Sequence, residues 1–322
     1  MQRIEYIDIA KGICIILVVA YHCSIHAGQC LDTALSNVRM PLYFFLSGFF
    51  FKTYGSWFNL LRKKTNKLLV PFLFFYVTTS VIFPAVFHDA FGVQINTVCG
   101  WASTYAFIWP EEFPNLPIWF LWSLFLANML FFLIADISRN KYWLTALITF
   151  VIGSAGYAMK FYETDLPAFI DTTCYYIPFF CIGFGANKSE ILSRDFGKAQ
   201  YWCLSVSLLI ICILFANIKS GILPLNVLLF YTSCTSGIAF VLMLSKQWGR
   251  VPLITYYGRY SIMILVTHVL VIRACRRFLE PAIADADICS VATLLCVMLI
   301  SLMLIPIMRR YIPWFVAQKD LI

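Results

Sequence analysis

The chain has 322 residues, of which 61% are hydrophobic and 12% are charged, and its formal net charge is +8. Soluble domains carry about 25% charged residues, so the polar side chains here are too few to cover a water-facing globule of this size. The composition argues against a soluble enzyme, a coiled coil and a disordered protein, and it predicts a polytopic membrane protein.

Unbroken apolar runs at 204–216 and 291–307 lack the alternation of a transmembrane β-strand, so we expect an all-α helical bundle. One crossing takes about 20 residues, so the chain has room for about ten. No repeat or linker divides it, and we expect a single domain over 1–322 without an appended soluble domain. The longest connection, 88–116, is expected to lie at the membrane interface or to dip back into it, because of its Trp and Tyr residues. The expected spans are 7–28, 37–54, 68–87, 117–137, 142–158, 169–186, 201–217, 222–244, 259–274 and 288–308.

Ten spans place both termini on one side of the membrane. If that side is the cytoplasm, eighteen of the 24 Lys and Arg residues face inward and six face outward. Because Lys and Arg concentrate in cytoplasmic loops, the sequence predicts cytoplasmic termini. The positive charge then reflects topology and contact with anionic membrane lipids, so no nucleic-acid partner is expected.

The first span carries the most informative polar residues, which are Asp8, Lys11, His22 and His26. Lys11 and His22 are eleven residues apart, which is three helical turns and a rise of about 16 Å. The four residues therefore share one stripe, which we expect to face a cavity, because ionisable groups inside a membrane are costly and usually functional. The alternative is that Asp8 and Lys11 anchor the helix at the interface while His22 bonds a neighbouring helix.

The second span contains Pro41, Ser47 and Gly48, which by themselves are typical of ordinary helix packing. The basic cluster that follows includes Lys64 and Lys67 before Pro71. This cluster either marks the cytoplasmic side or binds the phosphates of a donor such as coenzyme A.

Near the end of the chain, Ser261 and His268 are seven residues apart and share a helix face. A lone membrane histidine is usually a packing residue, but a second one in a bundle that already holds His22 leaves a functional role equally open. The 12 cysteines are mostly single residues in apolar runs, with no zinc-like Cys/His spacing, so we expect packing thiols and no metal site.

Taken in order, these segments resemble the membrane acyltransferase-3 family, which contains bacterial O-acyltransferases of cell-surface carbohydrates. The family's first-helix motif has an acidic residue, a basic residue followed by Gly, and a His after ten further residues. Asp8, Lys11, Gly12 and His22 match it, although many members have Arg at the position of Lys11. The other similar segments are FFLSGFF (44–50), LRKKTNKLLVPF (61–72), PIWFLWSLF (117–125), IPFFCIGF (177–184) and YGRYSIMILVTH (257–268).

The resemblance implies transfer of an acetyl or other short acyl group from a cytoplasmic donor, acetyl-CoA, to a hydroxyl of a lipid-linked or exported carbohydrate. It implies a small single-domain sugar O-acetyltransferase in a bacterial cell membrane, with His22 as the catalytic residue. Lys11, Lys64 and Lys67 would contact the donor, with Asp8 paired to Lys11, and Ser47, Ser261 and His268 would support the acceptor or His22.

Two mechanisms remain open for His22. It acts either as a general base on the sugar hydroxyl or as a carrier of the acyl group. A transporter or flippase for a glycan or small metabolite is the alternative function, since such proteins also place His and Lys along a path through a bundle. No inverted repeat is visible in this sequence, which argues against it.

Overall fold

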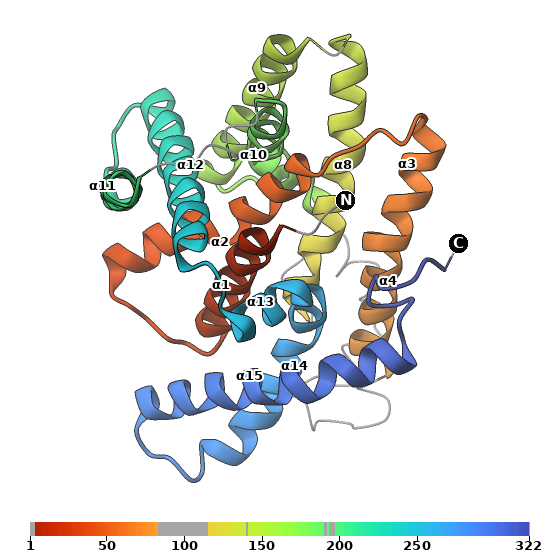
Figure 1. The fold of residues 1–322 in the computed structure, drawn as a ribbon, viewed down its shortest axis with the longest axis vertical. Coiled ribbons are helices and arrows are strands. Elements are labelled where there is room, and N and C mark those ends of the chain that lie inside the picture. Colours follow the sequence, from red (N-terminus) through yellow and green to blue (C-terminus); the bar gives the residue numbers. More distant parts are fainter. Residues whose placement is uncertain (1–3, 83–114, 140, 190–191, 193–196, 322) are drawn as a thin grey trace.

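The structure is a computed structural model that describes residues 4–82, 115–139, 141–189, 192 and 197–321. Within these ranges every regular element is helical (Figure 1). The principal helices are α1 Glu5–His22, α2 Gln29–Phe49, α3 Trp57–Lys64, α4 Val70–Val77, α8 Trp119–Ile137, α9 Tyr142–Phe161, α10 Ile170–Lys188, α11 Lys198–Asn217, α12 Leu223–Trp248, α13 Pro252–Arg259, α14 Ser261–Leu279 and α15 Ala286–Tyr311.

Two π-helical turns and two short 3-10 turns complete the described helices. The π turns are η1 Thr65–Leu69, which joins α3 to α4, and η2 Thr78–Ile82, which follows α4. The 3-10 turns η5 Leu116–Ile118 and η6 Pro167–Phe169 lead into α8 and α10.

The described part of each of the ten predicted spans overlaps a helical segment. Among the described residues, six segments are long and apolar enough to cross a membrane: Leu116–Ile137, Tyr142–Phe161, Pro167–Lys188, Ala199–Asn217, Leu223–Trp248 and Ala286–Tyr311. The described chain is thus an all-helical membrane protein. The full count of about ten crossings and the side of the termini stay predictions.

The two largest errors in the predicted boundaries have local causes. The first helix ends at His22 instead of residue 28, because Ser24 takes a left-handed backbone with φ of 61°. The second begins at Gln29 instead of residue 37, because polar side chains in its first turns bond the helix itself, as Thr33 does by donating to the Gln29 carbonyl at 2.8 Å. The predicted interfacial segment, 88–116, lies outside the described residues as far as residue 114.

Helix α1 lies near the middle of the molecule, with α12 to its left and α14 and α15 below it in Figure 1. It packs most extensively against the short helix α13. At their crossing a Cβ on Gly12 would collide with the Ile254 carbonyl, so only glycine permits this approach. Beside the crossing, the buried Asp8 carboxylate lies 3.9 Å from Arg259 Nε.

Helix α2 packs along α10, and Gly48 has the same function there, because a Cβ would strike the Phe180 carbonyl. The aromatic core begins next to this crossing, where Phe44 stacks on Tyr176 at 4.9 Å between ring centroids. These two glycine crossings fix α1 and α2, the helices that carry half of the predicted site residues.

Candidate active site

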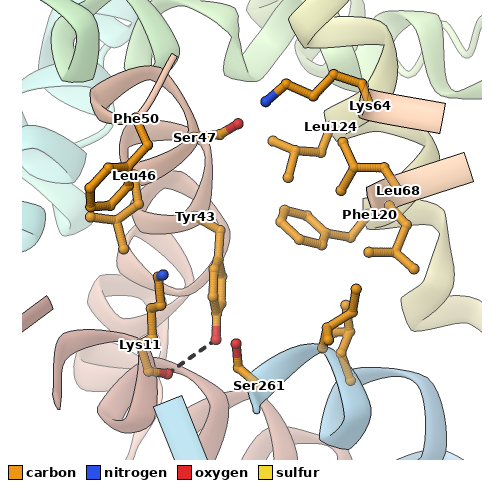
Figure 2. Close-up of a pocket in the computed structure, with 13 residues that line it drawn as sticks. Lys11, Tyr43, Leu46, Ser47, Phe50, Lys64, Leu68, Phe120, Leu124 and Ser261 are labelled. Atoms are coloured by element: carbon orange, nitrogen blue, oxygen red, sulfur yellow. Dashed lines mark hydrogen bonds between the residues drawn. The ribbon is translucent and has the colours of Figure 1, made fainter. Parts of the chain in front are cut away.

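A cavity of about 260 Å³ lies between α1, α2, α8, α14 and the α3–η1 segment. Figure 2 shows Lys64 and Ser47 toward one end of it and Lys11 and Ser261 toward the other. Four of the predicted residues therefore line one space, although they come from four segments far apart in the sequence. The remaining lining residues are Tyr43, Leu46, Phe50, Leu68, Phe120, Leu121, Leu124, Ile262 and Leu265.

The cavity has a lysine at each end. Burial lowers the pKa of Lys64 to about 8, so this ammonium has lost much of its water. Lys11 Nζ lies 5.6 Å from the centroid of the Phe50 ring, within range of a cation–π contact. Two ammonium groups on mostly apolar walls that also carry hydroxyls suit an anionic ligand with an apolar or amide-bearing arm.

Hydroxyl groups line the cavity between the lysines, and neighbouring residues orient them. Tyr43 Oη donates to the Lys11 carbonyl at 3.1 Å, as the dashed line in Figure 2 shows. Asn128 Nδ2 donates to the Leu124 carbonyl at 2.7 Å and to Ser47 Oγ at 3.2 Å. Because Asn128 already supplies a proton to Ser47 Oγ, the Ser47 hydroxyl can donate its own proton to a ligand.

The two predicted histidines lie together. The ring centroids of His22 and His268 are 5.1 Å apart, although the residues come from helices 246 positions apart in the sequence. His268 is fully buried, and its Nδ1 lies 3.0 Å from the Ile264 carbonyl and 2.9 Å from the Leu265 carbonyl. Since carbonyls only accept, Nδ1 carries the proton and the neutral ring keeps a lone pair on Nε2.

The Nε2 atom of His268 is buried and has no hydrogen-bond partner among the described residues. It is therefore an acceptor that a neighbouring N–H or a ligand hydroxyl can use. His268 follows the cavity-lining Leu265 by one helical turn, so the histidine pair lies beyond the Ser261 end of the cavity.

Two predicted residues lie elsewhere. His26 is wrongly placed on the first-helix stripe, because it follows the end of α1 and contacts Asp32 at 3.3 Å, with its side chain 65% exposed. Lys67 is on the π-helical turn, whose wider turns break the α-helical spacing to Lys64. Its Nζ donates to the Ala317 carbonyl at 2.9 Å and lies 3.0 Å from Asp320 Oδ1.

Asp320 belongs to the segment that follows α15, and it also accepts a 2.8 Å hydrogen bond from Lys63 Nζ. The bonds from Lys63 and Lys67 lower the pKa of Asp320. Part of the predicted basic cluster is thus neutralised by the chain itself, while Lys64 faces the cavity.

The predictions missed Tyr43, Asn128 and Arg39. Tyr43 is four residues before Ser47, so the helical period could have placed it on the same face. The Arg39 guanidinium lies 4.3 Å from the Tyr21 ring centroid, and that ring lies 5.3 Å from His22, so Arg39 is a cation near the histidine pair. Asn128 is polar within an apolar helix, which is itself an indication of function.

No group of three or more potential metal ligands gathers in the part of the chain that the structure describes. The eleven cysteines in that part are free thiols.

Fold and site together define an all-helical membrane protein with a basic cavity next to a pair of histidines, of which His268 is buried and His22 is partly exposed. A model of the acyltransferase-3 family, described as an acyltransferase domain, matches residues 4–310. The chain belongs to this family and is a membrane acyltransferase. No curated protein sequence and no solved structure matches it significantly.

Proposed function

We propose that this protein transfers an acetyl group from cytoplasmic acetyl-CoA to a hydroxyl of a lipid-linked or exported carbohydrate, with His22 as the catalytic residue. It would work as a multi-pass protein of a bacterial cell membrane with both termini in the cytoplasm. The observation that carries the proposal is the position of the His22–His268 pair beyond a cavity with a lysine at each end.

The size of the cavity suits part of the donor. Sites that enclose a drug-sized ligand measure roughly 300–1,000 Å³, whereas this cavity measures about 260 Å³. It would take the arm of the donor, with the acyl thioester extending past the Ser261 end toward His22 and the nucleotide outside near the basic cluster. Lys64 would attract the donor phosphates and Lys11 would bind the arm, while the hydroxyls of Ser47 and Ser261 offer hydrogen bonds to its amides.

The reaction needs a base near the sugar hydroxyl. A neutral His22 ring would take the hydroxyl proton as the sugar oxygen attacks the thioester carbonyl. The carbon–sulfur bond then breaks, and the imidazolium returns the proton to the sulfur of coenzyme A. The products are a sugar acetate and free coenzyme A, so no further reactant is needed.

His268 would act on His22 as a positioning residue. Its Nε2 lone pair can accept an N–H from His22, which leaves the other His22 nitrogen free to act as the base. The same contact would stabilise the imidazolium that forms during the reaction. Asp8 lies beside Arg259, and this ion pair would keep α1 packed against α13.

A purified-protein assay tests this function against transport and against an acyl-histidine carrier. The protein in liposomes receives acetyl-CoA labelled in the acetyl group together with a glycan acceptor. Transfer predicts labelled ester on the glycan in step with release of coenzyme A. Labelled protein that forms without acceptor would indicate the carrier mechanism, whereas movement of solute without any ester would contradict the proposal.

A further inference from the structure

A second cavity, of about 510 Å³, lies on the other side of α2 from the candidate active site. It separates the helix pair α9–α10 from the pair α11–α12, and Phe45 of α2 is also part of its lining. On the same helix, Leu46 and Ser47 line the first cavity, so α2 forms a wall between the two spaces.

The two helix pairs touch at one end and separate at the other. At the closed end Tyr231 Oη donates to the Tyr175 carbonyl at 3.0 Å, and the Tyr175 and Phe230 rings lie 4.6 Å apart. At the open end the cavity is lined by Tyr142 at the start of α9, Ala186 near the end of α10, and Lys246 near the end of α12. The space is therefore a wedge that opens where Lys246 lies.

The walls of the wedge are mostly apolar and offer few hydrogen-bonding groups to water. Ile238 and Leu242 line it from α12 and Ile182 from α10. The hydroxyl of Thr235, one of the few polar groups on the wall, already donates to the Tyr231 carbonyl at 2.7 Å. Apolar cavities of this kind exclude water and bind apolar groups.

The mouth of the wedge is polar and positively charged. Lys246 Nζ lies 5.3 Å from the centroid of the Tyr6 ring, and Lys246 also lines an adjoining surface hollow. Glu5 in that hollow lies 3.7 Å from Arg250 Nε, so its negative charge is offset there. An ammonium group carries three N–H donors, so Lys246 can contact a phosphate beside its other neighbours.

We propose that this wedge is a binding site for an anionic phospholipid, with one acyl chain between α10 and α12 and the phosphate at Lys246. Bilayer chains are the apolar material available to a membrane protein, and a lysine can lay its stem on apolar walls while its ammonium meets a head group. The predicted orientation puts Lys246 at the cytoplasmic leaflet, where anionic lipids attract basic residues.

The site is independent of the proposed acetyl transfer, because α2 separates the two cavities and lipid binding is measured without donor or acceptor. The delipidated protein is titrated with phosphatidylglycerol or with phosphatidylcholine of the same chains, and bound lipid is counted by native mass spectrometry. We expect one phosphatidylglycerol per protein, bound at least roughly tenfold tighter than phosphatidylcholine. Both lipids carry a phosphate, but the choline group of phosphatidylcholine adds a positive charge that Lys246 repels.

Two variants that fill the wedge from opposite walls test its location. Ala239→Trp and Ala186→Leu should each remove the bound phosphatidylglycerol, because both residues line the cavity. Val206→Trp, at a position on α11 that is 51% exposed, should bind it as the wild type does. Retention by both filled variants, or loss from the control, would overturn the assignment.

Charge variants test the head-group contact. Lys246→Gln should still bind lipid but should lose the preference for phosphatidylglycerol over phosphatidylcholine. Lys188→Gln removes an exposed ammonium that lies over the Phe184 ring, and the preference should persist. Equal binding of the two lipids by the wild type, or binding of a polyprenyl phosphate in place of either, would contradict a phospholipid site.

Discussion

The ring of His22 on α1 lies 5.1 Å from the ring of His268 on α14, and the Nδ1 of His268 faces two backbone carbonyls. This arrangement leaves an Nε2 lone pair on His268 directed away from its own helix turn, in a buried environment. The pair thus differs from two packing histidines. Backbone carbonyls fix the tautomer of the His268 ring, and its Nε2 is left as a hydrogen-bond acceptor for nearby groups.

The first prediction concerns this acceptor. His268→Phe should lower kcat by about 10²-fold or more, the low end of what a general base contributes, because His22 would no longer be held in its base form. His268→Gln, which retains an amide acceptor, should recover part of the loss and should shift the pH profile of kcat. A His268→Phe enzyme with unchanged kcat and pH profile would show that the residue only packs.

The second prediction concerns pH and the donor. Burial lowers the pKa of Lys64 to about 8, so this side chain is charged below that pH and loses its charge as the pH rises above it. Attraction of donor phosphate should weaken in step, and kcat/KM for acetyl-CoA should fall between pH 7 and pH 9. Because arginine stays charged in this range, Lys64→Arg should flatten this fall.

The matched loss of charge at the same position is Lys64→Gln. It should raise KM for acetyl-CoA roughly tenfold or more, since a hydrogen bond to a charged group is worth about 1.5–3 kcal/mol. Lys141→Gln changes an exposed lysine and should leave KM unchanged. An identical pH profile in wild type and Lys64→Arg would remove Lys64 from donor binding.

The third prediction concerns the contact between the C-terminal segment and the basic cluster. Asp320 forms ion pairs with both Lys63 and Lys67, so Asp320→Asn should leave both ammonium groups more available to the donor. KM for acetyl-CoA should then fall by a factor of about five at most, because an exposed ion pair is worth about 1 kcal/mol or less. Asp287→Asn, an exposed carboxylate on α15, provides the control, and a rise in KM for Asp320→Asn would contradict this account.

The fourth prediction concerns the packing of α1 against α13. Gly12→Ala puts a methyl group into the Ile254 carbonyl, so the α1–α13 crossing must open. Overpacking of this kind costs about 1–3 kcal/mol, and the Tm in detergent should fall accordingly. Gly221→Ala meets no atom within 4 Å and should leave Tm close to the wild-type value. Equal Tm values for the two variants would mean that the crossing is looser than the structure shows.

The sequence predicted much of the fold because membrane helices are coded by local apolar runs. The six helices that are long and apolar enough to cross a membrane were predicted with small boundary errors. Errors were larger where polar groups satisfy one another within a helix, as in the first turns of α2, or where one left-handed residue ends a helix, as Ser24 does after α1. Neither effect is visible in an average of hydropathy.

The site was only partly predictable for a related reason. The period of α1 placed Asp8, Lys11 and His22 on one stripe. It could not show that Lys11 and Lys64 lie at opposite ends of one cavity or that the His22 ring lies beside the His268 ring. Those contacts depend on the packing of α1 against α13 and α14. The π-helical turn at Thr65–Leu69 likewise separates Lys64 from Lys67, which an α-helical period would place on the same face.

The central claim is that His22 carries out the transfer, and a comparison with His26 tests it most directly. Both histidines lie near the end of α1, but His26 is exposed and bonded to Asp32, whereas His22 is beside His268. Each is changed to alanine in cells that make the native glycan, and ester-linked acetate on the glycan is measured by mass spectrometry. The account predicts loss of acetate in His22→Ala at normal protein levels and wild-type acetate in His26→Ala, and full acetylation in His22→Ala would contradict it.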